Sequence, residues 1–278
     1  MTVRRAVPLL LVAALAAGCS ANDPAPSPGP GASSSPSVGP SATPGPGRPL
    51  AGRVVVLDPG HQLGNRHHTA QIGRPVDAGG FEKECNTTGT ATAGGFPEST
   101  FTWRVAQETR RVLERLGARV VLTRGSDSDD RWGPCIDARG RIGNPGQPGP
   151  TADLRVSIHA DGVLDGGATG FHVIRPERLP GWTDDIAKPS RRLAVAVRDA
   201  LVDGGFRASS YQGVEGVDVR GDLGTLNLSD VPAVMVELGN MRDAAEAAVM
   251  ESRSGQRRYG RALAAAVRDF LSGRGPRG

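Results

Sequence analysis

The chain has 278 residues, with 38% hydrophobic and 4% aromatic residues and a formal net charge of +4. This length is long for one domain but short for two large ones. The basic residues are scattered and no aromatic residues alternate with them, so we expect no nucleic acid among its partners. A mildly basic protein suits an anionic polymer or lipid surface instead.

The N-terminal segment has the features of an export signal. Two arginines at positions 4 and 5 precede an apolar run over residues 7–17, which is too short to span a bilayer as a mature helix. The run leads into Ala16-Ala17-Gly18-Cys19, which resembles the lipobox of lipoprotein precursors except that Ala16 stands where Leu or Val is usual. We expect residues 1–19 to form a signal peptide and Cys19 to be lipidated. Ordinary secretion with cleavage near Ala17 is the alternative, and in both cases the protein leaves the cytoplasm.

Residues 20–50 consist almost entirely of Pro, Ser, Gly and Ala. Such a composition cannot bury enough apolar area to fold, so we predict a disordered, extended tether. Its physical use would be to hold the folded part some tens of ångströms from a membrane. The folded domain is expected over residues 51–273.

From residue 53 onward, short apolar runs alternate with helical patterns. Apolar runs predict buried strands over residues 54–57, 118–122, 154–158, 171–174 and 233–236. Helical spacing predicts helices over residues 98–116, 190–201, 244–251 and 256–271. The Gly-rich segment 61–97 and the Gly/Pro-rich segment 139–152 are predicted as loops. Strands that alternate with helices predict a single α/β domain with a central mixed, largely parallel sheet flanked by helices.

The chain contains three cysteines. If Cys19 carries lipid, Cys85 and Cys135 remain, and an even remainder in an oxidising compartment predicts one disulfide. This bridge would close a loop of about 50 residues and contribute on the order of 4 kcal/mol by chain entropy. Two buried free thiols are the alternative.

Residues suited to metal chemistry follow three of the predicted strands. His61 comes after the first strand and an Asp-Pro-Gly turn, His159 ends the strand 154–158, and Glu237 follows the strand 233–236. Ligands of open α/β sheets gather at the carboxyl ends of the strands, so we expect these three side chains to converge. Two His and one carboxylate are a typical ligand set of catalytic zinc, which keeps a fourth position open for water.

The same segments carry motifs that resemble those of zinc-dependent N-acetylmuramoyl-L-alanine amidases. They read Val56-Leu57-Asp58-Pro59-Gly60-His61, Ser157-Ile158-His159-Ala160-Asp161 and Val236-Glu237-Leu238-Gly239-Asn240. The resemblance extends over residues 53–271, and Gly95-Phe96-Pro97-Glu98 is similar to the actinobacterial branch. It implies a mixed α/β fold and cleavage of the amide between N-acetylmuramic acid and L-alanine of the stem peptide of peptidoglycan. It also implies that His61 and His159 bind Zn2+ and that Glu237 is the catalytic base.

The family supplies its third zinc ligand from a Glu just before the first helix, and two candidates occur here. Glu84 lies in a Glu-Lys-Glu segment in mid-loop, whereas Glu98 lies at the predicted start of a helix. Regular structure positions a ligand better than a loop does, so we expect Glu98 to be the ligand. The segment from His61 to Glu98 is longer than the family pattern, and the expected bridge from Cys85 would pin it near the site.

Further residues are candidates for secondary roles. Asp58 is interpreted either as orienting a ligand or as a plain turn residue. Asp161 and Asn240 adjoin site residues and are candidates to face substrate. Arg220 is placed to meet a stem-peptide carboxylate, with a solvated side chain as the alternative. His172 alternates within a predicted strand and is expected to be packed or exposed on one face of the sheet.

The expected reaction follows from charge placement. Zinc lowers the pKa of a bound water, and Glu237 accepts its proton and delivers it to the leaving amine. Imidazoles bind metal only when neutral, so activity is expected to fall below about pH 6.

Two alternative functions remain, a zinc peptidase acting on wall peptides and a non-catalytic wall-binding lipoprotein. We expect a monomer in the cell envelope, anchored to the outer face of the cytoplasmic membrane.

Overall fold

A six-stranded sheet lies at the centre of the computed structural model, which describes residues 47–274. Its strands, in spatial order, are β4 (Arg119–Leu122), β1 (Val54–Pro59), β5 (Leu154–Asp161), β8 (Ala233–Asn240), β6 (His172–Pro176) and β7 (Val217–Arg220). Neighbours from β4 to β8 are parallel, β6 is antiparallel to β8, and β7 is parallel to β6. The predicted mixed, largely parallel sheet is confirmed. The expected signal peptide, Cys19 and most of the tether lie outside the described residues.

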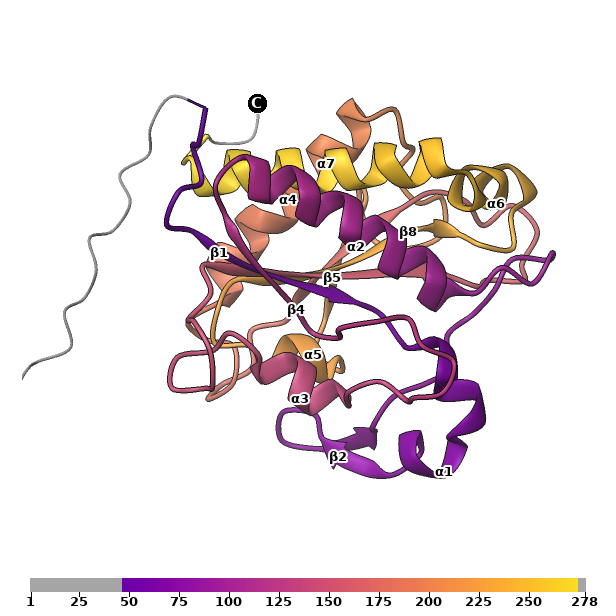
Figure 1. Cartoon of the computed structure of the whole chain (residues 1–278), viewed down its shortest axis with the longest axis horizontal. Coiled ribbons are helices and arrows are strands. Elements are labelled where there is room, and N and C mark those ends of the chain that lie inside the picture. Colours follow the sequence, from indigo (N-terminus) through magenta and orange to yellow (C-terminus); the bar gives the residue numbers. More distant parts are fainter. Residues whose placement is uncertain (1–46, 275–278) are drawn as a thin grey trace, which may run out of the picture. The chain divides into compact units, whose positions relative to one another are not determined.

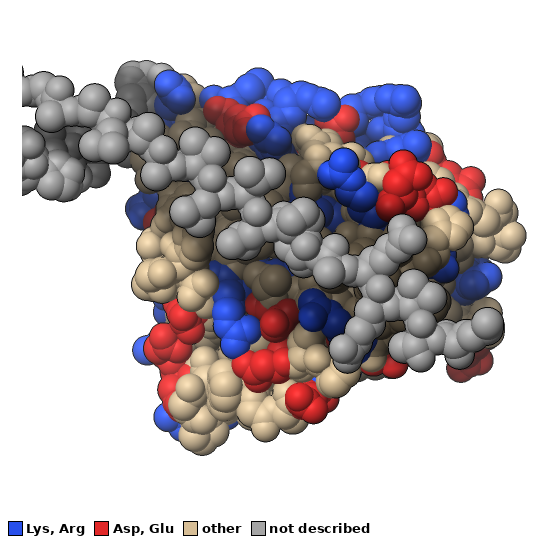
Figure 2. All heavy atoms as spheres, turned by 60° about the horizontal axis from the view of Figure 1, so that its bottom comes forward, with Lys and Arg blue, Asp and Glu red and all other residues tan. Residues whose placement is uncertain are grey.

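Helices cover both faces of this sheet (Figure 1). One face carries α2 (Glu98–Arg115), α4 (Ala187–Asp203), α6 (Ala244–Glu251) and α7 (Arg253–Leu271). The other face carries the shorter α3 (Ile136–Arg141) and α5 (Gly224–Asn227). Helix α7 packs between α2 and α4, and the main core fills the space between these helices and the sheet. Lys and Arg side chains gather along the upper edge of the view in Figure 2, with some Asp and Glu side chains among them.

Local sequence explains the limits of α2. Pro97 precedes its first residue with an extended backbone, and proline is disfavoured inside a helix. Phe101, Val105 and Leu113 recur at helical spacing and are fully buried against the sheet and α7. The helix ends because Gly117 takes a φ of 101°, and the amide of Ala118 then donates to the carbonyl of Leu113 at 3.0 Å.

The segment 61–97 contains more regular structure than the sequence predicts. It holds a 3-10 turn (Leu63–His67), α1 (Thr69–Ile72) and a two-stranded antiparallel hairpin of β2 (Pro75–Asp77) and β3 (Glu82–Glu84). The predicted loop 139–152 likewise begins inside α3, and β7 and α5 were not predicted at all. These elements are three to six residues long, too short to show a hydrophobic period.

No helix within residues 47–274 is long and apolar enough to cross a membrane. The described residues all fall in one compact unit of the chain. Strands β1, β5 and β8 lie side by side in the middle of the sheet, and their carboxyl ends define the edge at which the candidate residues meet.

Candidate active site

Two imidazoles and one carboxylate meet at the carboxyl edge of the sheet. The candidate ligand atoms of His61, Glu98 and His159 all lie within 4.8 Å of one another. One oxygen of Glu98, Oε1, is 3.1 Å from His61 Nε2 and 3.1 Å from His159 Nδ1. His61 follows β1, Glu98 opens α2 and His159 lies in β5. Nitrogen and oxygen atoms in this number and proximity suit a Zn2+ ion with an open coordination position.

The loop that carries His61 is held in an unusual conformation. His61 has a φ of 56°, in the left-handed region that residues other than glycine rarely adopt. The guanidinium of Arg139 donates to the carbonyls of His61 at 2.6 Å and Pro59 at 2.8 Å. The His61 ring nitrogen Nδ1 lies 3.2 Å from the carbonyl of Thr87. Strained backbone persists only where its surroundings fix it, and here they fix the direction of one imidazole.

Asp58 holds Arg139, the residue that binds the His61 loop, in place. Its carboxylate accepts from Arg139 at 2.7 Å, from Ser157 at 2.5 Å and from Thr123 at 2.5 Å. Burial by itself would raise the pKa of Asp58, but the charge of Arg139 and the two hydroxyl hydrogen bonds outweigh burial and hold the pKa well below its usual range. Asp58 therefore stays ionised, and it acts on His61 through Arg139 because it makes no direct hydrogen bond to either imidazole.

Glu98 is fixed by backbone amides as well as by the imidazoles. Thr90 N donates to its Oε2 at 2.9 Å, and Ala160 N donates to its Oε1 at 3.1 Å. Burial would raise the pKa of Glu98, but the charges and hydrogen bonds of His61 and His159 outweigh burial and lower the pKa. The alternative acid, Glu84, is exposed on β3 and lines the same cleft outside the cluster. The choice of Glu98 at the helix start therefore agrees with the geometry.

Glu237 lies beside the cluster on β8. It is in register with His159 of β5 on one side and with His172 of β6 on the other, so the three side chains form a row across the sheet. Its Oε2 is buried and has no hydrogen-bond partner within residues 47–274. Burial, and then the negative charges of Asp161 and Glu98, raise the pKa of Glu237 well above its usual range. A carboxylate in this state readily takes up a proton.

A second group of polar residues flanks Glu237 at the end of β5. Tyr211 Oη donates to Asp161 Oδ2 at 2.6 Å, and His172 Nδ1 lies 3.5 Å from the same oxygen. Burial lowers the pKa of His172. No sequence pattern points to Tyr211, because it lies in a loop without periodicity. His172 was expected to be a packed or exposed strand residue, and only the register of β6 against β8 reveals that it neighbours Glu237.

Asn240 and Arg220, two of the residues expected to contact substrate, instead bind other residues of the protein. Asn240 is 2% exposed, and its amide donates to the carbonyls of Val163 and Ala168 at 2.9 and 2.8 Å. It therefore holds the loop after β5 and does not line the cleft. Arg220 makes a two-pronged ion pair with Asp222 at 2.7 and 2.6 Å. Lys83 of the β2–β3 hairpin contacts the same carboxylate at 3.2 Å.

The cleft above the cluster has a volume of about 520 Å³. The metal-suited residues and Glu237 form its floor, Lys83 and Glu84 of β3 border one side, and Leu223 and Gly224 at the start of α5 border another. Asp161 also lines it, which agrees with its expected position near substrate. A cleft of this size accommodates several residues of an extended substrate.

Two glycines are required for close packing at the floor. A Cβ on Gly60 would lie 2.3 Å from Cε1 of His159. A Cβ on Gly89 would lie 2.8 Å from Oε2 of Glu98 and 2.9 Å from Cδ2 of His61, and Gly89 also has a φ of 75°. The cluster therefore assembles only because these positions lack side chains.

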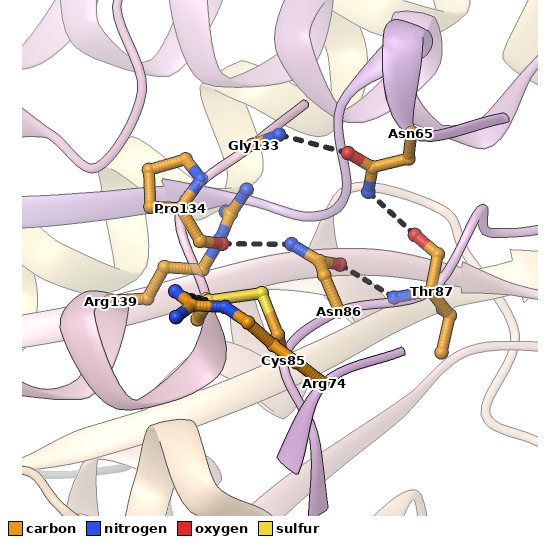
Figure 3. The surroundings of a disulfide bond; sticks show 9 residues. Asn65, Arg74, Cys85, Asn86, Thr87, Gly133, Pro134 and Arg139 are labelled. Carbon is orange, nitrogen blue, oxygen red and sulfur yellow. Dashed lines mark hydrogen bonds between the residues drawn. A yellow bond between two sulfur atoms is a disulfide. The ribbon is translucent and has the colours of Figure 1, made fainter. Parts of the chain in front are cut away.

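The predicted disulfide joins Cys85 and Cys135, whose Cα atoms are 4.3 Å apart (Figure 3). Beside it, Asn86 Nδ2 donates to the carbonyl of Pro134 at 2.8 Å. The bridge ties the segment that contains Thr87 to the residues just before α3, the helix that contains Arg139. Both segments contact His61, so the disulfide braces the loop around this imidazole.

Comparison with known proteins gives the same picture. Residues 55–269 match the sequence profile of the N-acetylmuramoyl-L-alanine amidase family. An N-acetylmuramoyl-L-alanine amidase of Mycobacterium tuberculosis is 41% identical over 227 residues, which cover 81% of this chain and 89% of that protein. An amidase of Neisseria meningitidis is 27% identical, and 56% of its length is covered.

Solved structures of amidases also resemble this fold. The crystal structure of an N-acetylmuramyl-L-alanine amidase from Mycobacterium smegmatis matches with a TM-score of 0.73 and 38% identity, covering 81% of this chain and 99% of that one. The apo form of the enzyme from Mycobacterium abscessus matches with a TM-score of 0.73 and 41% identity, covering 80% and 100% of the respective chains.

An α/β sheet with a His-Glu-His cluster at its carboxyl edge and a neighbouring free carboxylate defines a class of metal-dependent hydrolases. Within this class, the chain belongs to the N-acetylmuramoyl-L-alanine amidase family, in its actinobacterial branch. It is therefore an enzyme that cleaves peptidoglycan.

Proposed function

We propose that the enzyme uses Zn2+ held by His61, Glu98 and His159, with Glu237 as the general base, to hydrolyse the amide between the lactyl group of N-acetylmuramic acid and L-alanine. The observation that supports this assignment is the shared position of Glu98 Oε1, 3.1 Å from a nitrogen of each imidazole. In the described residues, this is the only group of three or more His, Cys, Asp or Glu side chains close enough to hold a metal ion.

The donor set fits zinc on chemical grounds. Two neutral imidazoles and one ionised carboxylate leave a coordination position for water, as in catalytic zinc sites. The amides of Thr90 and Ala160 both donate to the Glu98 carboxylate, and such hydrogen bonds favour its ionised form. When bound, the metal would polarise the scissile carbonyl and make its water a stronger acid.

Glu237 then performs the proton transfers. Its buried, unpartnered Oε2 lies next to the cluster and is free to accept the proton of the attacking water. The raised pKa lets it hold this proton until the amine of L-alanine leaves and accepts it. Asp161, with Tyr211 bound to it, adds negative charge next to Glu237 and so favours the protonated state of the base.

We also propose where the enzyme acts. Residues 1–19 would direct export, Cys19 would carry lipid, residues 20–50 would form a tether, and residues 51–273 would form the catalytic domain. The lipobox-like sequence before Cys19 supports this arrangement. The enzyme would then be a monomer anchored at the outer face of the cytoplasmic membrane, with peptidoglycan within reach.

Metal content and product analysis test the catalytic proposal. Glu98→Gln is expected to lose bound zinc and the release of muramic acid from stem peptide. Glu84→Gln, which changes an acid of the same cleft outside the cluster, is the matched control and should keep both. Glu237→Gln should keep zinc and lose about 10²–10⁴ of the rate.

The products separate the alternatives. Intact stem peptide that begins with L-alanine supports the amidase, whereas cuts between amino acids would identify a wall peptidase. If the parent and Glu237→Gln clear suspensions of cell wall at the same rate, the protein would instead be a non-catalytic wall-binding protein.

A further inference from the structure

Helices α2 and α7 enclose a shallow groove on the outer side of their layer, away from the sheet. The groove has a volume of about 180 Å³. Its lining is polar and mostly basic, and we refer to it as the arginine groove: Trp103, Arg104, Gln107, Glu108, Arg111, Arg253, Gln256 and Arg257. The groove therefore contains four arginines and one glutamate: α2 contributes Arg104, Arg111 and Glu108, and α7 contributes Arg253 and Arg257.

The arginines of the groove are only partly neutralised. Glu108 pairs with Arg111 one turn along α2. Arg104 lies over the ring of Phe96 at 5.2 Å and forms no ion pair with an acidic side chain of the described residues. Within residues 47–274, the exposed side chains of Arg253 and Arg257 have no acidic partner within ion-pair distance. Guanidinium groups bind phosphate oxygens through paired hydrogen bonds, so this groove suits phosphodiesters.

The floor of the groove is rigid. Gln256 is 3% exposed, and its amide donates to the carbonyl of Met250 at 2.8 Å. Trp103 is half-buried, and its ring packs against the guanidinium of Arg124 at 5.0 Å. The basic side chains therefore surround a floor that is buried and hydrogen-bonded.

The groove and the catalytic cleft are separate surfaces with no lining residue in common. Phe101, Val105 and Leu113 face the core from α2, whereas the groove residues of this helix face outward. The cleft lies at the carboxyl edge of the sheet, so a flat surface against the α2–α7 layer would leave it accessible.

The start of the folded domain lies at one end of the same layer. Leu50 N donates to the carbonyl of Leu116 at 2.9 Å, which fixes the chain at the end of α2. Residues 20–49, if flexible, would have a root-mean-square span of about 30 Å. Helix α2, with 18 residues, is about 27 Å long. A lipid on Cys19 would thus let the α2–α7 layer lie against the bilayer.

We propose that the arginine groove binds the phosphate groups of anionic phospholipids and orients the catalytic domain on the membrane, with the cleft turned toward the wall. Charge complementarity, and the position of Leu50 at the end of α2, support this partner. The orientation, but not the phospholipid binding, rests on the lipid anchor proposed above. Each arginine near an anionic bilayer raises the partition coefficient about fivefold.

Vesicle binding of the chain from Ser20 onward, which carries no lipid, tests the proposal. A chain of this kind should fold, because the mycobacterial amidase structures consist almost wholly of this domain. We expect partition into vesicles of phosphatidylcholine with phosphatidylglycerol, and much less into phosphatidylcholine alone. Arg253→Gln/Arg257→Gln should bind the anionic vesicles roughly 30-fold more weakly.

Two further variants control for charge and folding. Arg131→Gln/Arg178→Gln removes two exposed arginines outside the groove and should bind within a few-fold of the parent. Arg253→Lys/Arg257→Lys keeps the charge and should retain most of the binding. The release of stem peptide from wall fragments without vesicles should be unchanged in all three variants.

The proposal fails if the parent does not distinguish the two kinds of vesicle, or if the glutamine variants inside and outside the groove weaken binding equally. Binding to anionic wall fragments without binding to phosphatidylglycerol vesicles would also overturn it. A parent that binds vesicles but releases no stem peptide would contradict the proposed catalysis and leave the lipid site standing.

Discussion

Replacement of Arg139 by Met should show how strongly the catalytic loop depends on one buried ion pair. Arg139 is 3% exposed and donates to Asp58, to the carbonyls of Pro59 and His61, and to the carbonyl of Pro134. The substitution leaves the Asp58 carboxylate buried without its cation. Breaking such a pair costs about 3–5 kcal/mol. For a domain of this size, this corresponds to a decrease in melting temperature of about 10 °C.

The same substitution should weaken the metal site. Arg139 bonds to the backbone of the turn that carries His61, so its loss frees this imidazole. Loss of a group that orients a ligand typically costs about 10–100-fold in metal affinity. Zinc affinity by competition with a chelator and melting by circular dichroism measure the two effects separately.

Two control variants test whether the buried ion pair is the cause of the loss of stability. Arg141 lies on the same helix and pairs with Asp77, but these side chains are 37% and 42% exposed. Arg141→Met should therefore change the free energy of unfolding by less than about 1 kcal/mol. The double variant Asp58→Asn/Arg139→Met should recover part of the loss because position 58 then carries no buried charge that lacks its Arg139 partner. If Arg139→Met unfolds at the same temperature as Arg141→Met, the buried pair does not stabilise the loop.

The pH dependence follows from the lowered pKa of Asp58. The pKa of an Asp side chain in the unfolded protein is about 3.9. Because the pKa of Asp58 is lower in the folded protein, its ionised form stabilises the fold above this pH, and the stabilisation is lost as the pH falls toward the folded-state pKa. The difference in stability between the parent and Arg139→Met should therefore narrow below about pH 4. A constant difference from pH 7 to pH 3 would contradict the assignment.

Three other outcomes are expected. Gly60→Ala should abolish zinc binding because its Cβ would lie 2.3 Å from His159. Gly125→Ala is the control and should keep zinc, because a Cβ at this position would have no atom within 4 Å. The zinc content of both purified proteins tests this prediction. Cys85→Ser/Cys135→Ser should lower the free energy of unfolding by up to about 4 kcal/mol, and an unchanged denaturation midpoint would contradict the bracing role. Burial raises the pKa of Glu237 most, and the negative charge of Asp161 raises it further. Asp161→Asn removes this charge, so the acidic limb of the profile of rate against pH should move to lower pH. A limb that stays at the same pH would exclude this coupling.

Much of the catalytic centre could be predicted because it follows from strand ends. His61, His159 and Glu237 each follow a short apolar run, and parallel strands bring such residues to one edge of the sheet. Glu98 was preferred over Glu84 because it begins a helix, and the structure places it, unlike Glu84, in the cluster. The single remaining pair of cysteines likewise predicted the bridge that the structure contains.

The sequence by itself thus determined five of the six strands, the longer helices and the residues that converge at the carboxyl edge, because hydrophobic period and strand ends are local properties of the chain. Only the tertiary structure decided which groups support them. Arg139 reaches Asp58 across 81 positions, from a segment whose glycines and prolines predicted a loop. Tyr211 and His172 approach Asp161 through the register of β6 and a loop without periodicity. Contacts of this kind depend on how the elements pack, and no local pattern records them.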